Sequence, residues 1–251
     1  MYLSVIIPCY NEEENLKRGV LEEIFNFLKT KDFSWEVIVS DDGSNDLSRE
    51  VVKDQIKKLT GFRLLENPHG GKPSTLDHGI KDARGEYILF ADMDQSTPIT
   101  ELNKLIPYLN EGYNVVIGSR GLKRKDFPFY RKIGAAIFSS FRRLLILTEI
   151  KDTQCGFKLF QKDKLAIAFP KLEFFKKKRG VVGWTVTSFD VELLHILKKL
   201  GCKIKEVEVS WADRDTSTGK GSALKKYFKE SKEMFMQILR VKLNDVRHLY
   251  D

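Results

Sequence analysis

The segment Tyr87-Ile88-Leu89-Phe90-Ala91-Asp92-Met93-Asp94 decides the fold of this chain. Its first four residues are aromatic or aliphatic and have the composition of a buried strand. Side chains two residues apart project to the same side of an extended backbone, so Asp92 and Asp94 present two carboxylates together. In an open α/β sheet, ligands bind outside the carboxyl ends of the strands, where these carboxylates lie.

Carboxylate oxygens are the ligands that Mg²⁺ or Mn²⁺ prefers, and such ions commonly share their remaining positions with substrate phosphates. The segment therefore predicts a metal and diphosphate site. It leaves one alternative open, in which the two aspartates cap a helix that begins near Thr97-Pro98.

Apolar runs of strand type alternate with amphipathic helical patterns through the first 120 residues. The expected strands are Leu3–Ile7, Trp35–Val39, Phe62–Leu65, Tyr87–Asp94 and Asn114–Ile117. A further helix is expected from Ser188 to Leu200 and a further strand from Lys203 to Trp211, whereas Asp152–Phe160 fits no simple period. The alternation predicts an α/β fold with a mostly parallel sheet flanked by helices.

We expect one catalytic domain over residues 1–215, followed by a mobile loop and a C-terminal basic amphipathic helix over residues 216–251. Within the domain, residues 121–150 combine clustered Lys and Arg with an apolar helical face, which is typical of a membrane-interface segment. A core helix with basic edges is the alternative. For the C-terminal helix, membrane contact and packing against the body both remain open.

Composition restricts the class of partner. The 251 residues include 43 Lys and Arg against 35 Asp and Glu, a net charge of +8, which favours nucleic acid, a phosphorylated ligand or an anionic membrane. The three cysteines lack CxxC spacing, so the sequence indicates no disulfide framework or zinc site and fits a reducing cytosol. We expect no signal peptide, and no membrane span, because Arg142 and Arg143 interrupt the most apolar stretch.

Two apparent motifs are set aside. Gly70-Gly71-Lys72 is similar to part of a phosphate-binding P-loop, but Glu66 and Pro73 replace the glycine and the hydroxyl residue that the motif requires. Lys72 can still contact phosphates. The four histidines have no metal-ligand spacing, so each is expected to be structural or exposed.

Six short motifs follow one another in order along the chain. They are Val5–Glu13, Asp41–Ser44, Asp92–Asp94, Gly118–Arg120, Asp152–Lys158 and Phe189–Leu194. Together they resemble the inverting nucleotide-sugar glycosyltransferases of family 2, which have the GT-A fold. The last two motifs look most like those of dolichyl-phosphate β-glucosyltransferases and other polyprenyl-phosphate glycosyltransferases. The resemblance covers residues 3 to 211.

The resemblance implies a nucleotide-sugar site built from the first motifs. Pro8, Tyr10 and Glu12 match the loop that holds the nucleoside, where a ring packs on the base and a carboxylate accepts hydrogen bonds. Asp41 and Asp42 match the loop that reads the edge of uracil or guanine. Helix capping is their alternative role.

The same resemblance assigns Asp92, Met93 and Asp94 to the metal and diphosphate. Asp94 is the expected direct ligand of Mg²⁺ or Mn²⁺, and Asp92 the expected contact on the sugar and ribose side. The ion neutralises charge that grows on the departing nucleoside diphosphate. Met93 stands where many relatives have Ala, and is expected to narrow the sugar pocket.

On the acceptor side, Arg120 and Arg131 match positions that hold the acceptor phosphate in related enzymes. A lipid phosphate has a second pKa of about 6 and is largely ionised at neutral pH, so it needs no strong general base. Asp190 falls where relatives that act on hydroxyl acceptors place the base; here it can orient the phosphate or sugar, or cap a helix. Asp94, Arg120 and Asp190 form the predicted catalytic group.

The resulting hypothesis is a cytoplasmic, peripherally membrane-associated enzyme. It transfers a sugar, expected to be glucose, from a UDP-sugar to dolichyl or another polyprenyl phosphate with inversion, without nucleic acid as a partner. One alternative is a transferase of the same fold that acts on a hydroxyl of a glycan or lipid-linked oligosaccharide and uses Asp190 as its base. A second is a non-catalytic module that binds nucleic acid or anionic membrane. The oligomeric state stays open.

Overall fold

A seven-stranded sheet forms the centre of the computed structural model, which describes residues 1–121, 145–176, 189–214 and 223–250, with side chains described outside 223–234. The strand order is β3-β2-β1-β4-β6-β5-β7. The strands are β1 Leu3–Cys9, β2 Trp35–Asp41, β3 Phe62–Glu66, β4 Tyr87–Phe90, β5 Val115–Ser119, β6 Lys158–Gln161 and β7 Ile204–Glu208. All neighbouring strands pair in parallel except β6, which is antiparallel to both β4 and β5.

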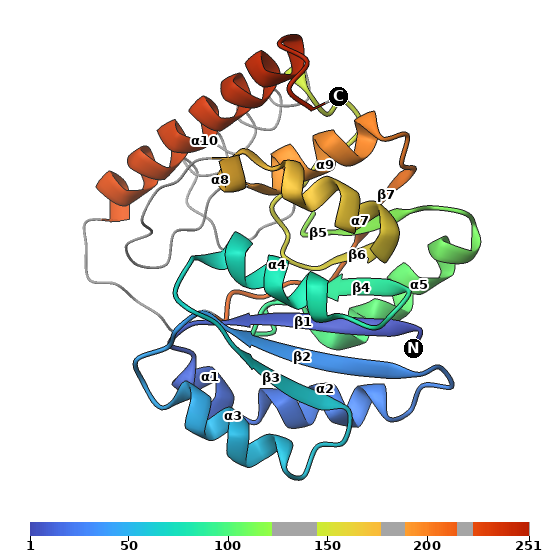
Figure 1. Ribbon diagram of the computed structural model, residues 1–251, viewed down its shortest axis with the longest axis vertical. Helices are drawn as coiled ribbons and strands as arrows, with labels where there is room; N and C mark the ends of the chain where they lie inside the picture. The colour runs from blue at the N-terminus through green and yellow to red at the C-terminus, as the bar shows by residue number, and fades with distance from the viewer. Residues whose placement is uncertain (122–144, 177–188, 215–222, 251) are drawn as a thin grey trace.

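Helices cover both faces of the sheet (Figure 1). On one face lie α1 Glu13–Lys17, α2 Val20–Leu28, α3 Ser48–Ile56 and α5 Leu102–Asn110, which the 3₁₀ turn Ile99–Glu101 precedes. On the other lie α4 Lys72–Asp82, α7 Lys162–Ala168, the 3₁₀ turn Phe169–Lys171, α8 Glu173–Lys176, α9 Phe189–Lys199 and α10 Ala223–Val246. Because both faces are covered, strand β1 is buried along its whole length, as continuous apolar runs in parallel sheets usually are.

The predicted α/β class and mostly parallel sheet are confirmed. Strand β6 was not predicted, because it begins in the segment that fits no simple period. Lys158 interrupts an otherwise apolar run there, yet its side chain is buried within the protein. The pattern failed because a charge inside a core strand removes the periodic signal on which strand prediction depends.

The strand directions bring the motif-bearing loops to one edge of the sheet. The loops after β1, β2, β4 and β5 all leave from the carboxyl ends of parallel strands. Strand β6 runs the opposite way, so its amino end, with the preceding residues Cys155-Gly156-Phe157, arrives at that same edge. One reversed strand thus adds a further loop to the place where parallel strands gather their ligands.

The C-terminal helix α10 packs against the body through α9, with Ile238 and Val241 fully buried. Of the segment expected to meet a membrane, residues 122–144 lie outside the described part, while Leu147 and Ile150 are buried in the core. Residues 215–222 of the expected mobile loop also lie outside it. Within the described ranges, no helix is both long enough and apolar enough to cross a bilayer.

Candidate active site

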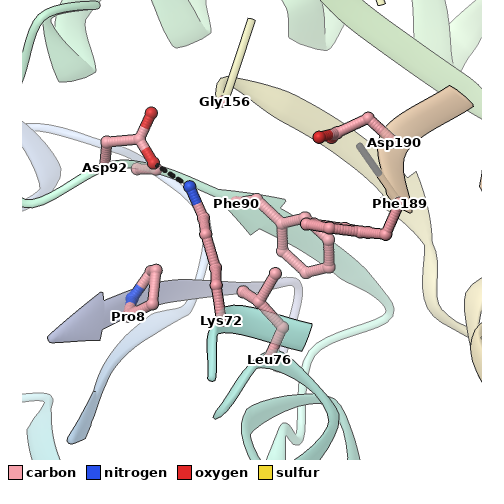
Figure 2. A pocket seen from close by; sticks show the side chains of 9 residues that line it. Pro8, Lys72, Leu76, Phe90, Asp92, Gly156, Phe189 and Asp190 are labelled. Carbon is pink, nitrogen blue, oxygen red and sulfur yellow. Dashed lines mark hydrogen bonds and ion pairs between the residues drawn. The ribbon is translucent and has the colours of Figure 1, made fainter. Parts of the chain in front are cut away.

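An ion pair between Asp92 and Lys72 lies at the carboxyl edge of the sheet (Figure 2). Asp92 follows β4, and Lys72 is the first residue of α4; Nζ of Lys72 donates to Oδ1 of Asp92 over 2.7 Å. Burial alone would raise the pKa of Asp92, but the charge of Lys72, with those of Lys158 and Arg120, lowers it. Burial likewise opposes the charge on Lys72, while Asp92 raises the pKa of its ammonium group. Both groups are therefore ionised at neutral pH.

Gly156 allows this carboxylate to sit where it does. A Cβ built on Gly156 would lie 1.9 Å from Oδ2 of Asp92, far inside van der Waals contact. The loop that precedes β6 therefore approaches Asp92 as closely as it does because glycine has no side chain. The position of this loop therefore limits how far the Asp92 carboxylate extends into the site.

We expect Gly156→Ala to lower kcat/KM by about 100-fold, because the added methyl displaces the Asp92 carboxylate by an ångström or more. The measurement is steady-state transfer together with calorimetric binding of the donor. Asp54→Ala, at an exposed position on α3, is the control, and both variants should melt near the wild-type temperature. Near wild-type kcat/KM in Gly156→Ala would contradict the prediction, and a lowered melting temperature of this variant would indicate a general effect on folding.

A second ion pair joins the buried Lys158 of β6 to Asp190 in the first turn of α9. The Lys158 side chain is 1% exposed, and its Nζ donates to Oδ1 of Asp190 over 2.5 Å and to the carbonyl of Cys155. An ammonium group this deeply buried requires such partners, because its desolvation is otherwise very costly. The pair ties the start of α9 to β6, which lies between β4 and β5 in the sheet.

Asp92 and Asp190 face each other across a small pocket (Figure 2). The lining is completed by Pro8, Lys72, Leu76, Phe90, Ala91, Gly156 and Phe189. Two carboxylates, each paired with a lysine, thus flank a space with apolar walls. The two carboxylates can accept hydrogen bonds from the hydroxyl groups of a ligand that reaches this pocket.

Arg120, after β5, is held by Asp152. Its Nε and Nη2 donate to the two oxygens of the carboxylate over 2.7 and 2.9 Å, and its backbone N–H donates to Oδ2 over 3.1 Å. The guanidinium carbon also lies 5.7 Å from the centre of the Trp211 ring. Although burial opposes the charge on Asp152, the hydrogen bonds and charge of Arg120 hold its pKa far below the ordinary value. The predicted contact of Arg120 with the acceptor phosphate stays a prediction.

We expect Asp152→Asn to lower the free energy of unfolding at pH 7 by about 2–4 kcal/mol, because it leaves Arg120 buried without its counter-charge. The folded-state pKa of Asp152 is depressed, so its stabilisation is complete above the unfolded value of about 3.9 and is lost as the pH falls toward the folded value. The difference in free energy of unfolding between wild type and variant, measured by urea unfolding, should therefore decrease below about pH 4. An equal gap at pH 7 and pH 3 would contradict this account.

Asp41 and Asp42, expected to read the base, are both fully buried. Asp41 accepts hydrogen bonds from the backbone N–H groups of Gly43 and Ser44 and from Nε of Arg49, at 3.1, 3.0 and 2.5 Å to Oδ1. These contacts form the turn after β2. The structure thus gives Asp41 a loop-ordering role, and a contact with the base stays a prediction.

Asp42 orders a different loop. Its carboxylate accepts hydrogen bonds from the N–H groups of Gly70 and Gly71, at 2.8 and 2.9 Å, and lies 2.9 Å from Nδ1 of His69. The His69 ring stacks on Tyr10, with centroids 4.8 Å apart. Because α4 begins directly after Gly71, the buried Asp42 also determines where Lys72 stands.

The predicted nucleoside loop after β1 is joined to the loop after β2. The N–H of Asn11 donates to Oγ of Ser44, and the N–H of Glu12 donates to Oγ of Ser48, at 3.0 and 2.8 Å. Pro8 lines the pocket, and Tyr10 and Glu12 follow on the same loop. The structure therefore gathers these three residues at the edge that also carries Asp92.

The sequence model of a known family, described as Glycosyl transferase family 2, matches residues 4–167. The chain belongs to this family. Dolichyl-phosphate beta-glucosyltransferase ALG5A of Trichomonas vaginalis is 34% identical over 266 residues, which cover 99% of this chain and 78% of that protein. The human dolichyl-phosphate beta-glucosyltransferase is 32% identical, with 86% and 68% covered. The protein is thus a glycosyltransferase that resembles these enzymes, which excludes the alternative of a non-catalytic module.

Solved structures support the fold. Glucosyl-3-phosphoglycerate synthase from Mycobacterium tuberculosis, in complex with Mn²⁺, UDP and glucosyl-3-phosphoglycerate, matches with a TM-score of 0.63, 18% identity and coverage of 96% of this chain and 79% of that one. Mannosyl-3-phosphoglycerate synthase from Rubrobacter xylanophilus matches with a TM-score of 0.64, 14% identity and coverage of 99% and 75%. At these identities the likeness concerns the architecture, and the expected GT-A fold is confirmed.

The aspartates of this glycosyltransferase differ in how well they suit a metal. Among the described residues, no group of three or more His, Cys, Asp or Glu could hold an ion. Asp94 is partly exposed, and its carboxylate accepts hydrogen bonds of 2.8 Å from the N–H and Oγ of Ser96. Mg²⁺ and Mn²⁺ need few protein carboxylates when a substrate diphosphate supplies oxygens, so Asp94 fits. The ammonium group of Lys72 already pairs with the Asp92 carboxylate. Asp92 therefore fits a contact with the sugar or ribose better than a contact with a metal ion.

Met93 is placed differently from the prediction. It is 2% exposed and packs in the hydrophobic core, so it does not narrow a sugar pocket. The physical reason is the backbone, because β4 ends at Phe90 and not at Asp94, and the turn that follows places Met93 in the core. Arg131, the second predicted phosphate contact, lies outside the described residues.

Three residues of the site carried little or no sequence signal. Arg18 donates from Nη2 to the carbonyl of Asp94 over 3.2 Å, and nothing in its local sequence predicted this contact. Gly156 is one glycine of 17, and its role depends on a neighbour 64 positions away. Lys158 did leave a signal in the sequence, because it is a single charged residue inside an apolar run. Such a residue either ends a strand or is buried with an ionic partner.

Proposed function

We propose that this glycosyltransferase transfers glucose from UDP-glucose to dolichyl or another polyprenyl phosphate, with inversion, at the cytoplasmic face of a membrane. The observation that carries the proposal is the pocket across which Asp92, paired with Lys72, faces Asp190, paired with Lys158. Its support comes from relatives over most of the chain that are named dolichyl-phosphate beta-glucosyltransferases. Glucosyl-3-phosphoglycerate synthase from Mycobacterium tuberculosis, which shares the fold, was also solved with Mn²⁺, UDP-glucose and glycerol 3-phosphate.

The donor lies with its diphosphate near Asp94 and its sugar in the pocket. Bound Mg²⁺ or Mn²⁺ supplies Lewis acidity toward the departing UDP, and Asp94 is the residue that would hold it. Asp92, kept ionised by Lys72, accepts hydrogen bonds from sugar or ribose hydroxyls. The Lys72 ammonium adds positive charge next to the diphosphate, and the loops around Tyr10 and Asp42 receive the nucleoside.

The acceptor phosphate approaches the opposite face of the sugar ring. One of its oxygens forms a bond to the anomeric carbon while the bond from that carbon to the UDP oxygen breaks, which inverts the configuration. A phosphate with a second pKa of about 6 is already ionised and gives up no proton at this step. Asp190 therefore has no proton to take, and Lys158 offsets the repulsion between its carboxylate and the phosphate. Arg120 and Arg131 are the proposed phosphate contacts.

The test is mass spectrometry of the lipid fraction after incubation of the purified protein with UDP-glucose, a polyprenyl phosphate and Mg²⁺, with a parallel sample in EDTA. We expect a glucosyl-phosphoryl-polyprenol that is absent with EDTA. Asp94→Ala should reduce its formation by about 100-fold or more, because the residue supporting charge on the leaving group is lost. Asp54→Ala, an exposed carboxylate on α3, is the control. Near wild-type turnover in Asp94→Ala would overturn the proposal.

A hydroxyl of a glycan or lipid-linked oligosaccharide is the second candidate acceptor, and the position of Asp190 in the pocket favours it. A hydroxyl must lose a proton during attack, so Asp190→Asn should then cost roughly 10²- to 10⁴-fold in kcat. With a phosphate acceptor we expect a loss below about tenfold, because Asn keeps the shape and no proton transfer is needed. Initial rates of Asp190→Asn with each acceptor class distinguish the two.

A further inference from the structure

Helix α10 uses one of its faces to pack on the protein. Ile238 and Val241 are fully buried against the layer of α9. Polar contacts fasten the same side, with Nε of Arg240 2.5 Å from Oε2 of Glu173 and Nζ of Lys199 3.0 Å from Oδ1 of Asp245. The orientation of the helix on the body is therefore fixed by both apolar and ionic contacts.

The opposite face carries a stripe of exposed apolar side chains. Met236, Leu239, Leu243 and Val246 are 58%, 41%, 54% and 65% exposed, and Leu249 beyond the helix end is 48% exposed. The helical residues follow one another at intervals of three and four, which places them along one side. Ten large apolar side chains are exposed among the described residues, and five lie in this short stretch, so they form a patch rather than a scatter.

The charge around this stripe is positive. Residues 236–250 contain three Lys and Arg against one Asp, a net charge of +2. Helical spacing places Lys242 and Arg247 at the two edges of the stripe. An apolar stripe bordered by basic residues is the geometry of a helix that lies in the interface of an anionic bilayer. Self-association through this face would instead bring the like charges of Lys242 and Arg247 from two copies to one interface.

We propose that the α10 stripe, formed by Met236, Leu239, Leu243, Val246 and Leu249, binds the surface of a bilayer that contains anionic lipid. The apolar side chains enter the boundary between headgroups and acyl chains, and the basic edges contact the headgroups. The purpose of this contact rests on the proposed function, since it brings the enzyme to the membrane that holds a lipid acceptor. Its test does not depend on that function.

The experiment is co-sedimentation of the full-length protein with phosphatidylcholine vesicles, with and without phosphatidylserine, in the absence of both substrates. Leu243→Asp combined with Val246→Asp should lower the partition coefficient between water and vesicles by at least about 100-fold, because two apolar side chains no longer enter the interface. Arg247→Gln should lower binding roughly fivefold on vesicles that contain phosphatidylserine and leave binding to neutral vesicles unchanged. Ile167→Asp, at an exposed apolar position on α7, is the matched control and should bind like wild type.

Two further measurements separate the possible failures. The stripe variant should melt at the wild-type temperature, because both replaced side chains are exposed, and should keep wild-type turnover with a short-chain polyprenyl phosphate in detergent. Absence of turnover in both the stripe variant and the wild type would overturn the proposed function without affecting the membrane proposal. Unchanged sedimentation of the stripe variant, or conversion of a wild-type dimer to a monomer by it in light scattering, would overturn the membrane proposal.

Discussion

The ion pair between Asp92 and Lys72 is the interaction on which the site depends. Each charge is costly at this position by itself, and each is retained because the other stands 2.7 Å away. The pair links the loop after β4 to the first residue of α4, so the carboxylate is positioned by a strand and the ammonium by a helix. Buried Asp42 fixes the start of that helix, and Gly156 leaves room for the carboxylate. A rigid frame thus presents one acidic group to a ligand.

The reversed strand β6 supplies the other half of the site. In a sheet of parallel strands, the loops at the carboxyl edge come from successive βα units. Because β6 runs against its neighbours, its amino end delivers Gly156 and Lys158 to that edge, and Lys158 holds Asp190 at the start of α9. Two carboxylates, each paired with a lysine, therefore face each other across the pocket. The proposed inverting transfer needs such opposition, since its leaving group and acceptor occupy opposite faces of the ring.

Helix α10 shows how one amphipathic pattern serves two surfaces. Its buried side gives the helix a fixed place on the body through Ile238 and Val241, and its outer side remains apolar through Leu243 and Val246. A helix that only closed the fold would present polar side chains outward. The two interpretations that the sequence left open, packing and membrane contact, are therefore compatible, because they involve different faces of the same helix.

The sequence by itself determined the α/β class, the order of most strands and the acidic residues at the strand ends, because these follow from local period and from short motifs. It could not determine β6, since Lys158 hides the strand period and its partner Asp190 is 32 residues away. It also assigned Met93 to the pocket, whereas the turn after β4 places that side chain in the core.

Only the tertiary structure decided which groups meet. The pairing of Asp92 with Lys72, the closeness of Gly156 and the enclosure of Arg120 by Asp152 depend on contacts between residues 20 to 64 positions apart. Local pattern carries no information on such contacts, because the energy of a charge in a protein is set by what surrounds it in space. The strands of this chain therefore follow from its local sequence, whereas the chemistry of its site follows from tertiary packing.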